Sequence, residues 1–506
     1  MPGQIQEQLV ANARNHPNRV LFGFQRKPGE TFSVTFRQFH DDVAAAAKLN
    51  IVSPHSLHFI AGKTGYEAIV TYVSAIVNQQ YPAFLSPLTP RSDPDIYQRE
   101  LARLIQRFRP HRVSGFPEGF VTGTTVPEPV HDGYGFVQFS SGTIGLRKGV
   151  FIGEQALADQ LTALAARLAI GPDDVVASWL PLYHDMGLIT SLFLPIFSGC
   201  SSYMMDPIEW SFRPQRILSL IAEHQATLCW QPDFALQHLS NWHDAGNPDS
   251  LPSLATLRLM TSCSEPCRLE SFQRFFDRFA RSGLRGDSLQ TCYATAETVF
   301  AVTQSNFQTP ADWSDNGSGI LSSGHPLENC ELETRMCDEQ GRGQIWLRCP
   351  FLFSGYLFQD TPAIQGNWYN TGDLGHIVSD TVTVHGRTDD TLIINGKKLF
   401  AHEIEHKLNS LPEIKGGRVI CLSNQGGSGV NIFYEGIELS PGSAQHIRTW
   451  VATACHVSID QVRLVPDRTL VKSSSGKISR RKTEQKLREQ NLLAPAPAPH
   501  PRNHQP

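Results

Sequence analysis

The sequence predicts an α/β fold with parallel sheets, a β-rich portion and a small α+β domain at the C-terminus. Apolar runs of strand length alternate with helical patterns, as in residues 175–180, 215–224 and 227–230. This alternation is typical of units in which helices connect parallel strands. The chain has 506 residues, which is too long for one hydrophobic core, so more than one domain is expected.

Further elements follow the same alternation. Residues 134–139 and 257–261 have strand patterns, and residues 154–168 and 269–279 have helix patterns. Residues 332–384 are richer in strand signals, which predicts a β-rich subdomain.

The composition changes near residue 387. The expected elements beyond it are helices at 402–409 and 443–454 and strands at 418–422 and 430–434. We therefore predict a large core at 1–387, a small α+β domain at 388–490, and a disordered tail at 491–506 that is rich in Pro, Ala and His.

Composition argues against several classes of protein. Hydrophobic residues make up 40% and the formal net charge is −4, so no overall attraction to nucleic acid or to an anionic membrane is expected. There is no apolar run of about 18 residues and no signal-peptide pattern, so we expect a cytoplasmic protein without a membrane span. The 10 cysteines form no Cys-x-x-Cys pair, which indicates reduced thiols.

A loop of small residues lies between a predicted strand and a predicted helix. Residues 138–150 read Gln-Phe-Ser-Ser-Gly-Thr-Ile-Gly-Leu-Arg-Lys-Gly-Val. Glycines allow close approach to a ligand, and backbone N–H groups and hydroxyls bind phosphate oxygens. The loop therefore predicts a phosphate site, although turns that bind nothing share this composition. It lacks the Gly-x4-Gly-Lys-Ser/Thr pattern, which argues against a P-loop NTPase.

Two segments place single polar side chains after strand patterns. His184 lies in the aromatic and glycine-containing stretch 179–188, which on its own could be an ordinary turn. Tyr293 is followed by small residues and Glu297, a pattern that suits a flat ring with a cation nearby. A lone Glu, however, is usually solvated.

Three more segments are polar turns or loops. Asp373 lies in the glycine-flanked stretch 368–375 and could accept two hydrogen bonds from a ribose diol, or be a simple turn residue. Residues 386–390 lie where the composition shifts, as expected of a hinge or of a salt-bridged linker. Lys477 lies in the Ser/Gly loop 472–480, which by itself could be a solvated basic loop.

Together, in this order and spacing, these segments resemble the adenylate-forming superfamily. That family includes acyl-CoA synthetases, fatty acyl-AMP ligases and peptide-synthetase adenylation domains. The resemblance covers residues 31–486, and the ordered set of motifs is far more specific than any one of them. It implies a ligase that uses ATP and Mg²⁺ to form an acyl-adenylate, releases pyrophosphate and transfers the acyl group to a thiol, with the C-terminal domain mobile.

The resemblance also implies roles for particular residues. Thr143 would contact the ATP phosphates, Glu297 would bind magnesium, and Lys477 would act in the first half-reaction. Tyr293 would lie near adenine, while Asp373 and Arg387 would contact ribose, and Asp389 would be the hinge. The nucleotide-binding candidates are Ser140, Ser141, Gly142, Thr143, Lys148, Ser264, Glu265, Tyr293, Ala294, Asp373, Arg387 and Lys477.

The acyl site is implied mainly by residues that follow predicted strands. His184, which is also a catalytic candidate, would be a gate beside the pocket. The substrate-binding candidates are His184, Trp230, Asp233, Phe234 and Ala294. Trp230 would shorten the pocket and Asp233 would face a polar substituent, unless they are a core Trp and a strand-end Asp. A short or medium, functionalised acid is the resulting hypothesis.

The acceptor of the acyl group is left open between two thiols. Residues 180–188 and 205–214 resemble the fatty acyl-AMP ligase branch most, which favours the phosphopantetheine of an acyl carrier protein in lipid or secondary metabolism. The short stretch 297–324 shows no extra insertion of the kind that branch often carries, so CoA stays possible. A non-catalytic nucleotide-binding homologue is a third reading, because Arg147, Ala294 and Cys263 depart from the family pattern.

Overall fold

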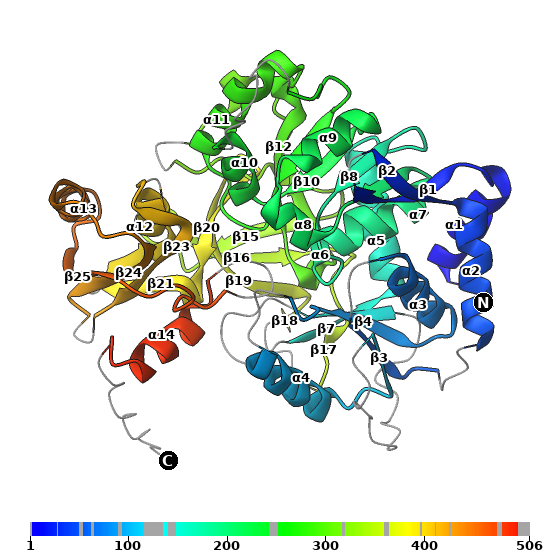
Figure 1. Ribbon diagram of the computed structural model, residues 1–506, viewed down its shortest axis with the longest axis horizontal. Helices are drawn as coiled ribbons and strands as arrows, with labels where there is room; N and C mark the ends of the chain where they lie inside the picture. The colour runs from blue at the N-terminus through cyan, green and yellow to red at the C-terminus, as the bar shows by residue number, and fades with distance from the viewer. Residues whose placement is uncertain are drawn as a thin grey trace. The chain divides into compact units, whose positions relative to one another are not determined.

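The computed structural model describes residues 3–27, 29–49, 54–61, 65–89, 94–115, 135–139, 148–241, 251–315, 319–358, 364–394, 397–409, 411–424, 427–472 and 478–493. These residues form two compact units, one that ends at His385 and one that begins at Gly386. The second unit therefore begins two residues before the expected boundary (Figure 1). No helix in the described part is both long and apolar enough to cross a membrane.

A nine-stranded sheet is the centre of the first unit, with the order β14-β13-β12-β11-β10-β8-β9-β1-β2. The strands from β1 through β9, β8, β10 and β11 to β12 are parallel to their neighbours, and β2, β13 and β14 at the edges pair antiparallel. The strands are β1 (Val20–Lys27), β2 (Glu30–Thr35), β8 (Val175–Ser178), β9 (Ser201–Met204), β10 (Leu228–Gln231), β11 (Leu259–Ser262), β12 (Leu289–Ala294), β13 (Ala301–Gln304) and β14 (His325–Pro326).

Helices of the first unit bury one apolar face each. In α11 (Leu269–Phe279), Phe272, Phe275 and Phe279 recur at helical spacing and are fully buried. The other helices of eight or more residues are α1 (Gln4–Asn15), α2 (Phe36–Leu49), α3 (Tyr66–Val77), α4 (Pro94–Phe108), α5 (Glu154–Arg167), α9 (Arg216–Glu223) and α10 (Asp233–Ser240).

Three smaller sheets complete the first unit. One is parallel, with β3 (Leu57–Ala61), β4 (Tyr81–Leu85) and β5 (Arg112–Ser114). Another is antiparallel, with β6 (Gly135–Phe139), β7 (Gly149–Gly153) and β17 (Gly355–Tyr356). The predicted β-rich subdomain contains β15 (Glu331–Arg335), β16 (Gly343–Arg348), β18 (Ile364–Gln365), β19 (Trp368–Val378) and β20 (Thr381–Arg387).

The second unit has its own sheet and its own core. The strands β23 (Ile414–Ser423), β24 (Gly429–Gly436) and β25 (Ser458–Leu464) form a three-stranded sheet. Its other elements are β21 (Thr391–Ile394), β22 (Lys397–Phe400), α12 (Ala401–Asn409), α13 (Pro441–Ala454) and α14 (Arg480–Glu489). Buried side chains such as Ile404, Val419 and Ile432 pack together within this unit.

The predicted α/β class, the parallel sheet and the β-rich subdomain are confirmed. The expected strand at 175–180 is shorter, because it ends at Ser178, whose hydroxyl accepts a hydrogen bond from the Leu180 N–H at 3.1 Å. Of the predicted tail at 491–506, residues 494–506 lie outside the described residues.

A buried carboxylate joins α10 to α11. Asp233, the first residue of α10, accepts hydrogen bonds from the Arg268 N–H at 3.1 Å, the Ser271 hydroxyl at 2.8 Å and the Gln237 amide at 2.8 Å. Burial, followed by the nearby charge of Glu265, raises the pKa of Asp233 to about 7, and the three donors oppose that shift.

The raised pKa predicts a pH-dependent stability. A carboxyl whose pKa is higher in the folded state than in the unfolded state favours folding while it is protonated. For Asp233 this contribution to the unfolding free energy is fully present below about pH 4 and is lost as the pH rises through about 7. We expect the unfolding free energy of the wild type, relative to Asp233→Asn, to fall by on the order of 2–4 kcal/mol between pH 4 and pH 8.

Urea unfolding of both proteins across that pH range measures the difference. The matched control is Asp277→Asn, a substitution at an exposed position of the same helix α11. A difference between wild type and Asp233→Asn that stays constant with pH would contradict the prediction.

Candidate active site

The segments predicted to form the site follow four neighbouring strands. Because β8, β10, β11 and β12 are parallel and adjacent, their carboxyl ends lie at one edge of the sheet. The segments with His184, Asp233, Ser264 and Glu297 each come within a few residues of one of these ends. The structure thus brings together residues that lie more than a hundred positions apart in the chain.

Tyr293 and Asp373 are in direct contact. Tyr293 lies at the end of β12, and its hydroxyl donates a hydrogen bond to Asp373 Oδ2 at 2.5 Å. The predicted adenine-side ring and the predicted ribose carboxylate therefore belong to one cluster, although they come from different sheets.

A bulge in β19 presents Asp373. The β16–β19 register shifts between Gln344 and Trp346, so that the stretch 371–373 faces a single residue of β16. Within it Gly372 has φ of 74°, a conformation that favours glycine. The Thr371 hydroxyl both donates to the Ile345 carbonyl at 2.9 Å and accepts from the Asp373 N–H at 3.1 Å.

Glu297 is held by a tyrosine that the sequence analysis did not select. The Tyr356 hydroxyl donates to Glu297 Oε1 at 2.7 Å, and the Lys148 ammonium lies 4.5 Å from the centre of the Tyr356 ring. Tyr356 is in β17, which pairs with the strand that directly follows Lys148. Lys148 and Glu297, both predicted site residues, are therefore connected through Tyr356.

A second missed tyrosine lies beside the first. The Tyr369 and Tyr356 hydroxyl oxygens are 3.4 Å apart. Burial, and then the nearby Glu297 carboxylate, raises the pKa of Tyr369 well above its usual range, so this phenol stays protonated. Tyr369 lies within the stretch 368–375 that was selected for Asp373, and this position was a signal that could have identified it, whereas nothing around Tyr356 in the sequence indicated its role.

The backbone next to Glu297 is strained. Glu297 lies in the short 3-10 turn Ala296–Thr298, and its carbonyl accepts a hydrogen bond from the Phe353 N–H at 2.8 Å. The following Val299 has φ of 64°, which is costly for a β-branched residue. Its carbonyl accepts a hydrogen bond from the buried Gln138 amide at 3.4 Å, which ties this turn to the end of β6.

The loop after β11 lies at the edge of the candidate site and also contacts the start of α10. Ser264 has a left-handed φ of 71°, and Glu265 Oε1 accepts a hydrogen bond from the Phe234 N–H at 2.7 Å. One oxygen of Glu265 therefore holds the start of α10. The half-buried Phe234 ring packs against Trp179 and Trp210, with centroid distances of 6.3 and 5.9 Å.

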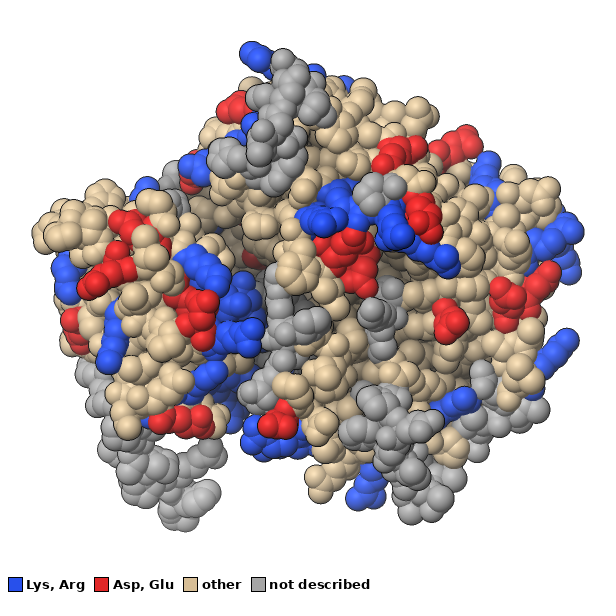
Figure 2. All heavy atoms as spheres, viewed as in Figure 1, with Lys and Arg blue, Asp and Glu red and all other residues tan. Residues whose placement is uncertain are grey.

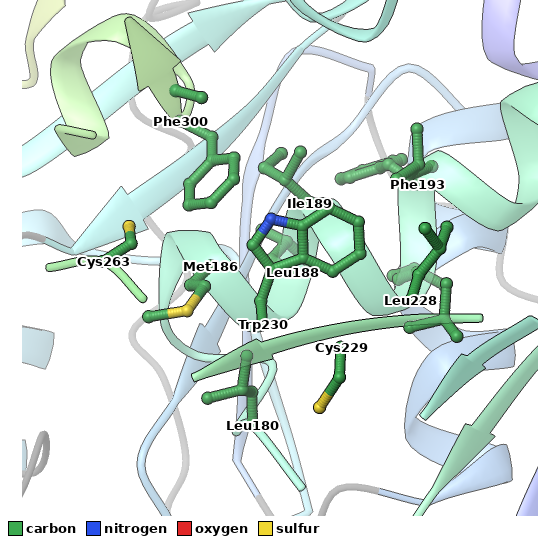
Figure 3. Close-up of a cluster of buried hydrophobic side chains, with 14 of the residues drawn as sticks. Leu180, Met186, Leu188, Ile189, Phe193, Leu228, Cys229, Trp230, Cys263 and Phe300 are labelled. Carbon is green, nitrogen blue, oxygen red and sulfur yellow. The ribbon is translucent and has the colours of Figure 1, made fainter. Parts of the chain in front are cut away.

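His184 and Trp230 border a buried apolar region. His184 precedes a short helix, α6 (Asp185–Gly187), that continues as a π-helix, η1 (Leu188–Phe193). Trp230 on β10 is only 1% exposed and packs in the cluster that Figure 3 shows. Ala294, the last residue of β12, is half-buried and packs against the same core.

Asp233 accepts three hydrogen bonds. One comes from Gln237 in α10, one from Ser271 in α11, and one from Arg268, the N-cap residue of α11. This geometry supports the alternative of a structural aspartate, because the carboxylate already accepts those bonds.

Arg387 and Asp389 are exposed at the start of the second unit. Arg387 precedes the short 3-10 turn Thr388–Asp390, which contains the predicted hinge residue Asp389. Within this unit Arg480 makes a bidentate ion pair with Glu405 at 2.7 and 2.8 Å, and its Nε lies 3.5 Å from Asp390. Burial lowers the pKa of Arg480, but the carboxylates outweigh burial and raise it.

Several predicted residues lie outside the described residues: Ser140, Ser141, Gly142, Thr143, Arg147 and Lys477. Their roles stay predictions. A bridge between Lys472 and Ile478 joins the two residues on either side of the stretch that contains Lys477.

The described residues fit a magnesium ion that is shared with phosphates. No three His, Cys, Asp or Glu side chains gather as a metal site in this part of the chain. Glu297 offers a half-buried carboxylate, oriented by Tyr356, and Mg²⁺ in phosphate-binding enzymes is commonly held by one or two carboxylates together with substrate phosphates.

Comparison with known proteins identifies the family of the chain. The profile of the family described as AMP-binding enzyme matches residues 50–357. The medium-chain-fatty-acid–acyl-carrier-protein ligase JamA of Moorena producens (strain JHB) is 25% identical over 414 residues, which is 72% of this chain and 70% of that protein. The putative fatty-acid–CoA ligase fadD21 of Mycobacterium leprae (strain TN) is 30% identical over 331 residues, which is 57% of this chain and 56% of that protein.

Solved structures share the fold over almost the whole chain. A fatty acyl-adenylate ligase from a study of the E. coli and L. pneumophila enzymes has a TM-score of 0.81, at 20% identity, with 97% of this chain and 98% of that chain covered. At this identity the likeness supports the fold alone. Since the family profile matches more than half of the sequence, the chain belongs to the AMP-binding enzyme family and is an adenylate-forming ligase.

Proposed function

We propose that the protein activates a carboxylic acid with ATP, forming an acyl-adenylate and releasing pyrophosphate, and then transfers the acyl group to a thiol. The observation that carries the proposal is the Tyr293–Asp373 hydrogen bond at the end of β12, with Glu297 four residues after Tyr293 and Tyr369 interacting electrostatically with both Tyr293 and Glu297. These residues provide a flat ring, a carboxylate suited to a ribose diol, and a carboxylate suited to magnesium at the carboxyl edge of the parallel strands.

The first step must overcome repulsion between two anions. A carboxylate about 4 Å from a phosphate charge is repelled by roughly 4 kcal/mol at an effective dielectric of about 20. Lys148, next to the predicted phosphate loop, and Lys477 are the cations that would offset this repulsion. A magnesium ion at Glu297 would supply further positive charge to the phosphates.

The protein's own contacts position the reacting groups. The hydroxyl of Tyr356 fixes one oxygen of Glu297, which leaves the other oxygen for a ligand. The hydroxyl of Tyr293 donates a hydrogen bond to Oδ2 of Asp373 and so restrains that carboxylate. Such fixed side chains stabilise a transition state more effectively than groups that must reorient during the reaction.

The thiol acceptor is best matched by the phosphopantetheine of an acyl carrier protein. JamA, a relative named for that acceptor, aligns over most of the chain, whereas fadD21, named for CoA, aligns over a shorter stretch. In residues 386–506 Lys and Arg outnumber Asp and Glu, and Figure 2 shows several such side chains on the second unit. That charge suits either anionic acceptor, so CoA is the alternative.

The lysine of the first step would be positioned by the second unit. Arg480 follows Lys477 by three residues and is fixed by Glu405 and by Asp390 next to the proposed hinge. A rotation about Asp389 would therefore carry the Lys477 segment with it. The alternative to an active ligase is a homologue that binds a nucleotide without catalysis. Exchange and binding assays distinguish the two.

Glu297→Gln should slow adenylation by about 100-fold, because a neutral amide binds a divalent cation poorly. Tyr356→Phe should cause a smaller loss and raise the magnesium concentration needed for half-maximal rate. ATP–pyrophosphate exchange over a magnesium titration measures both. The control is Glu328→Gln at an exposed position, and wild-type exchange in the Glu297 variant would refute the assignment.

Lys477→Ala should lose adenylation by about 100-fold while retaining ATP binding, since one transition-state cation is removed. Exchange assays give the rate, and calorimetric titration with ATP gives the affinity. Lys482→Ala in α14 is the matched control. Near-normal exchange in the Lys477 variant would show that another group fills this role.

Pyrophosphate release with a panel of acids should rise when a phosphopantetheinylated carrier protein is added. The rise reflects consumption of the adenylate by the thiol. Parallel reactions with CoA and with no thiol are the controls. Faster pyrophosphate release with CoA alone would assign the protein as a CoA ligase. No pyrophosphate release with any acid, while ATP still binds, would favour the non-catalytic alternative.

A further inference from the structure

The side chain of Trp230 fills the region beside the predicted acyl site. It is the penultimate residue of β10 and, at 1% exposed, the largest fully buried side chain in the described part of the chain. Successive side chains of a strand point to opposite faces, so Trp230 and Leu228 share one face of the sheet. Figure 3 shows both on the side of β10 where Ile189 and Phe193 of the π-helix η1 lie.

The indole nitrogen of Trp230 faces segments that belong to the site. Figure 3 shows the nitrogen on the edge of the ring that is nearer to Phe300, Met186 and Cys263. Met186 follows His184 by two residues, Cys263 precedes Ser264, and Phe300 follows Glu297 by three. The edge that carries the N–H therefore points toward the walls of the site rather than along the sheet.

That N–H has no hydrogen-bond partner among the described residues. An unpaired buried donor is unfavourable, and natural structures rarely leave one without a reason. A nearby tryptophan does have a partner. Trp179, which directly follows β8, donates a hydrogen bond from its indole nitrogen to Gln231 Oε1 at 3.1 Å. The indole nitrogens of Trp210, Trp313 and Trp346 also lack partners among the described residues, and these residues are 5–6% exposed, compared with 1% for Trp230.

A second feature of the backbone marks the same place. The helix that packs on Trp230 opens into a π-helix over Leu188–Phe193, and every residue of this segment is buried. π-helical turns are rare and are frequently found at functional sites, where the wider backbone reshapes a binding surface.

We propose that Trp230 is the end wall of the acyl pocket, and that its indole N–H donates a hydrogen bond to an oxygen of the bound acid. The acid would be short and would carry a keto or hydroxyl oxygen. This inference rests on the proposed adenylation function and specifies its substrate class.

The length limit follows from packing. A longer acyl chain that ran past Trp230 would have to displace the indole from between β10 and η1, where the interior is close-packed. The choice of an oxygen acceptor follows from charge and polarity. Trp offers only a donor, and its neighbours Phe300 and Met186 are apolar, so an ammonium group of an amino acid would find no oxygen or charged acceptor on these side chains.

Binding of non-hydrolysable acyl-sulfamoyladenosines tests the pocket without requiring catalysis. The probes are the hexanoyl compound, its 3-oxo, 4-oxo and 5-oxo analogues, and the dodecanoyl compound. For the wild type we expect hexanoyl to bind at least about tenfold more tightly than dodecanoyl, and the best oxo analogue about five- to tenfold more tightly than hexanoyl.

Two substitutions separate length from polarity. Trp230→Phe keeps an aromatic ring but lacks the N–H, so the preference for the oxo analogue should disappear. Trp230→Ala should improve dodecanoyl binding at least about tenfold, because it opens space beyond the wall. The matched control is Trp313→Phe, the same exchange at a buried indole that packs on Phe272 and Phe276 of α11, and it should leave both preferences unchanged.

The outcomes distinguish this inference from the proposed function. Equal wild-type affinity for hexanoyl and dodecanoyl probes, or an oxo preference retained in Trp230→Phe, would overturn the inference even if ATP–pyrophosphate exchange is active. Conversely, the expected binding pattern without exchange for any acid would leave the pocket assignment intact and refute the adenylation proposal. If Trp230→Ala unfolds in a thermal melt, Trp230→Phe and the wild-type chain-length series still decide.

Discussion

The parallel arrangement of β8, β10, β11 and β12 is the constraint on which the site depends. Parallel strands direct all their carboxyl ends to one edge, and the segments that contain His184, Asp233, Ser264 and Glu297 each follow one of these ends within a few residues. Four segments that are remote in sequence therefore meet at this edge. The helices that return the chain, such as α9 and α11, bury their apolar faces and so fix the spacing of those loops.

Two tyrosine–carboxylate hydrogen bonds then connect the large sheet to its neighbours. Tyr293 reaches Asp373 in the β-rich subdomain, and Tyr356 from a third sheet reaches Glu297. Each bond restrains a carboxylate of the candidate site. The strained conformation of Val299 is maintained in the same place, which is consistent with strain concentrating where function constrains the backbone.

Burial decides the chemistry of several groups around this edge. Burial raises the pKa of Asp233 and the pKa of Tyr369. The hydrogen bonds that each group makes then indicate whether its role is structural or in ligand binding. Asp233 faces three donors from α10, α11 and the residue that caps it, so it holds two helices together. Trp230 is equally buried, but its indole nitrogen has no partner among the residues that the structure describes, and this contrast motivates its proposal as a specificity residue.

The element types, the α/β class and the order of the motifs could be predicted from the amino-acid sequence, because these depend on local periodicity and on short spacings. The sequence also indicated Tyr293, Asp373 and Glu297 as members of one site through the resemblance. Which atoms come into contact could be learned only from the three-dimensional fold. Tyr356 lies 59 positions from Glu297, and a register shift in β19 presents Asp373 to Tyr293. Such contacts depend on sheet order, bulges and burial, which involve residues far apart in the chain and leave no local pattern in the sequence.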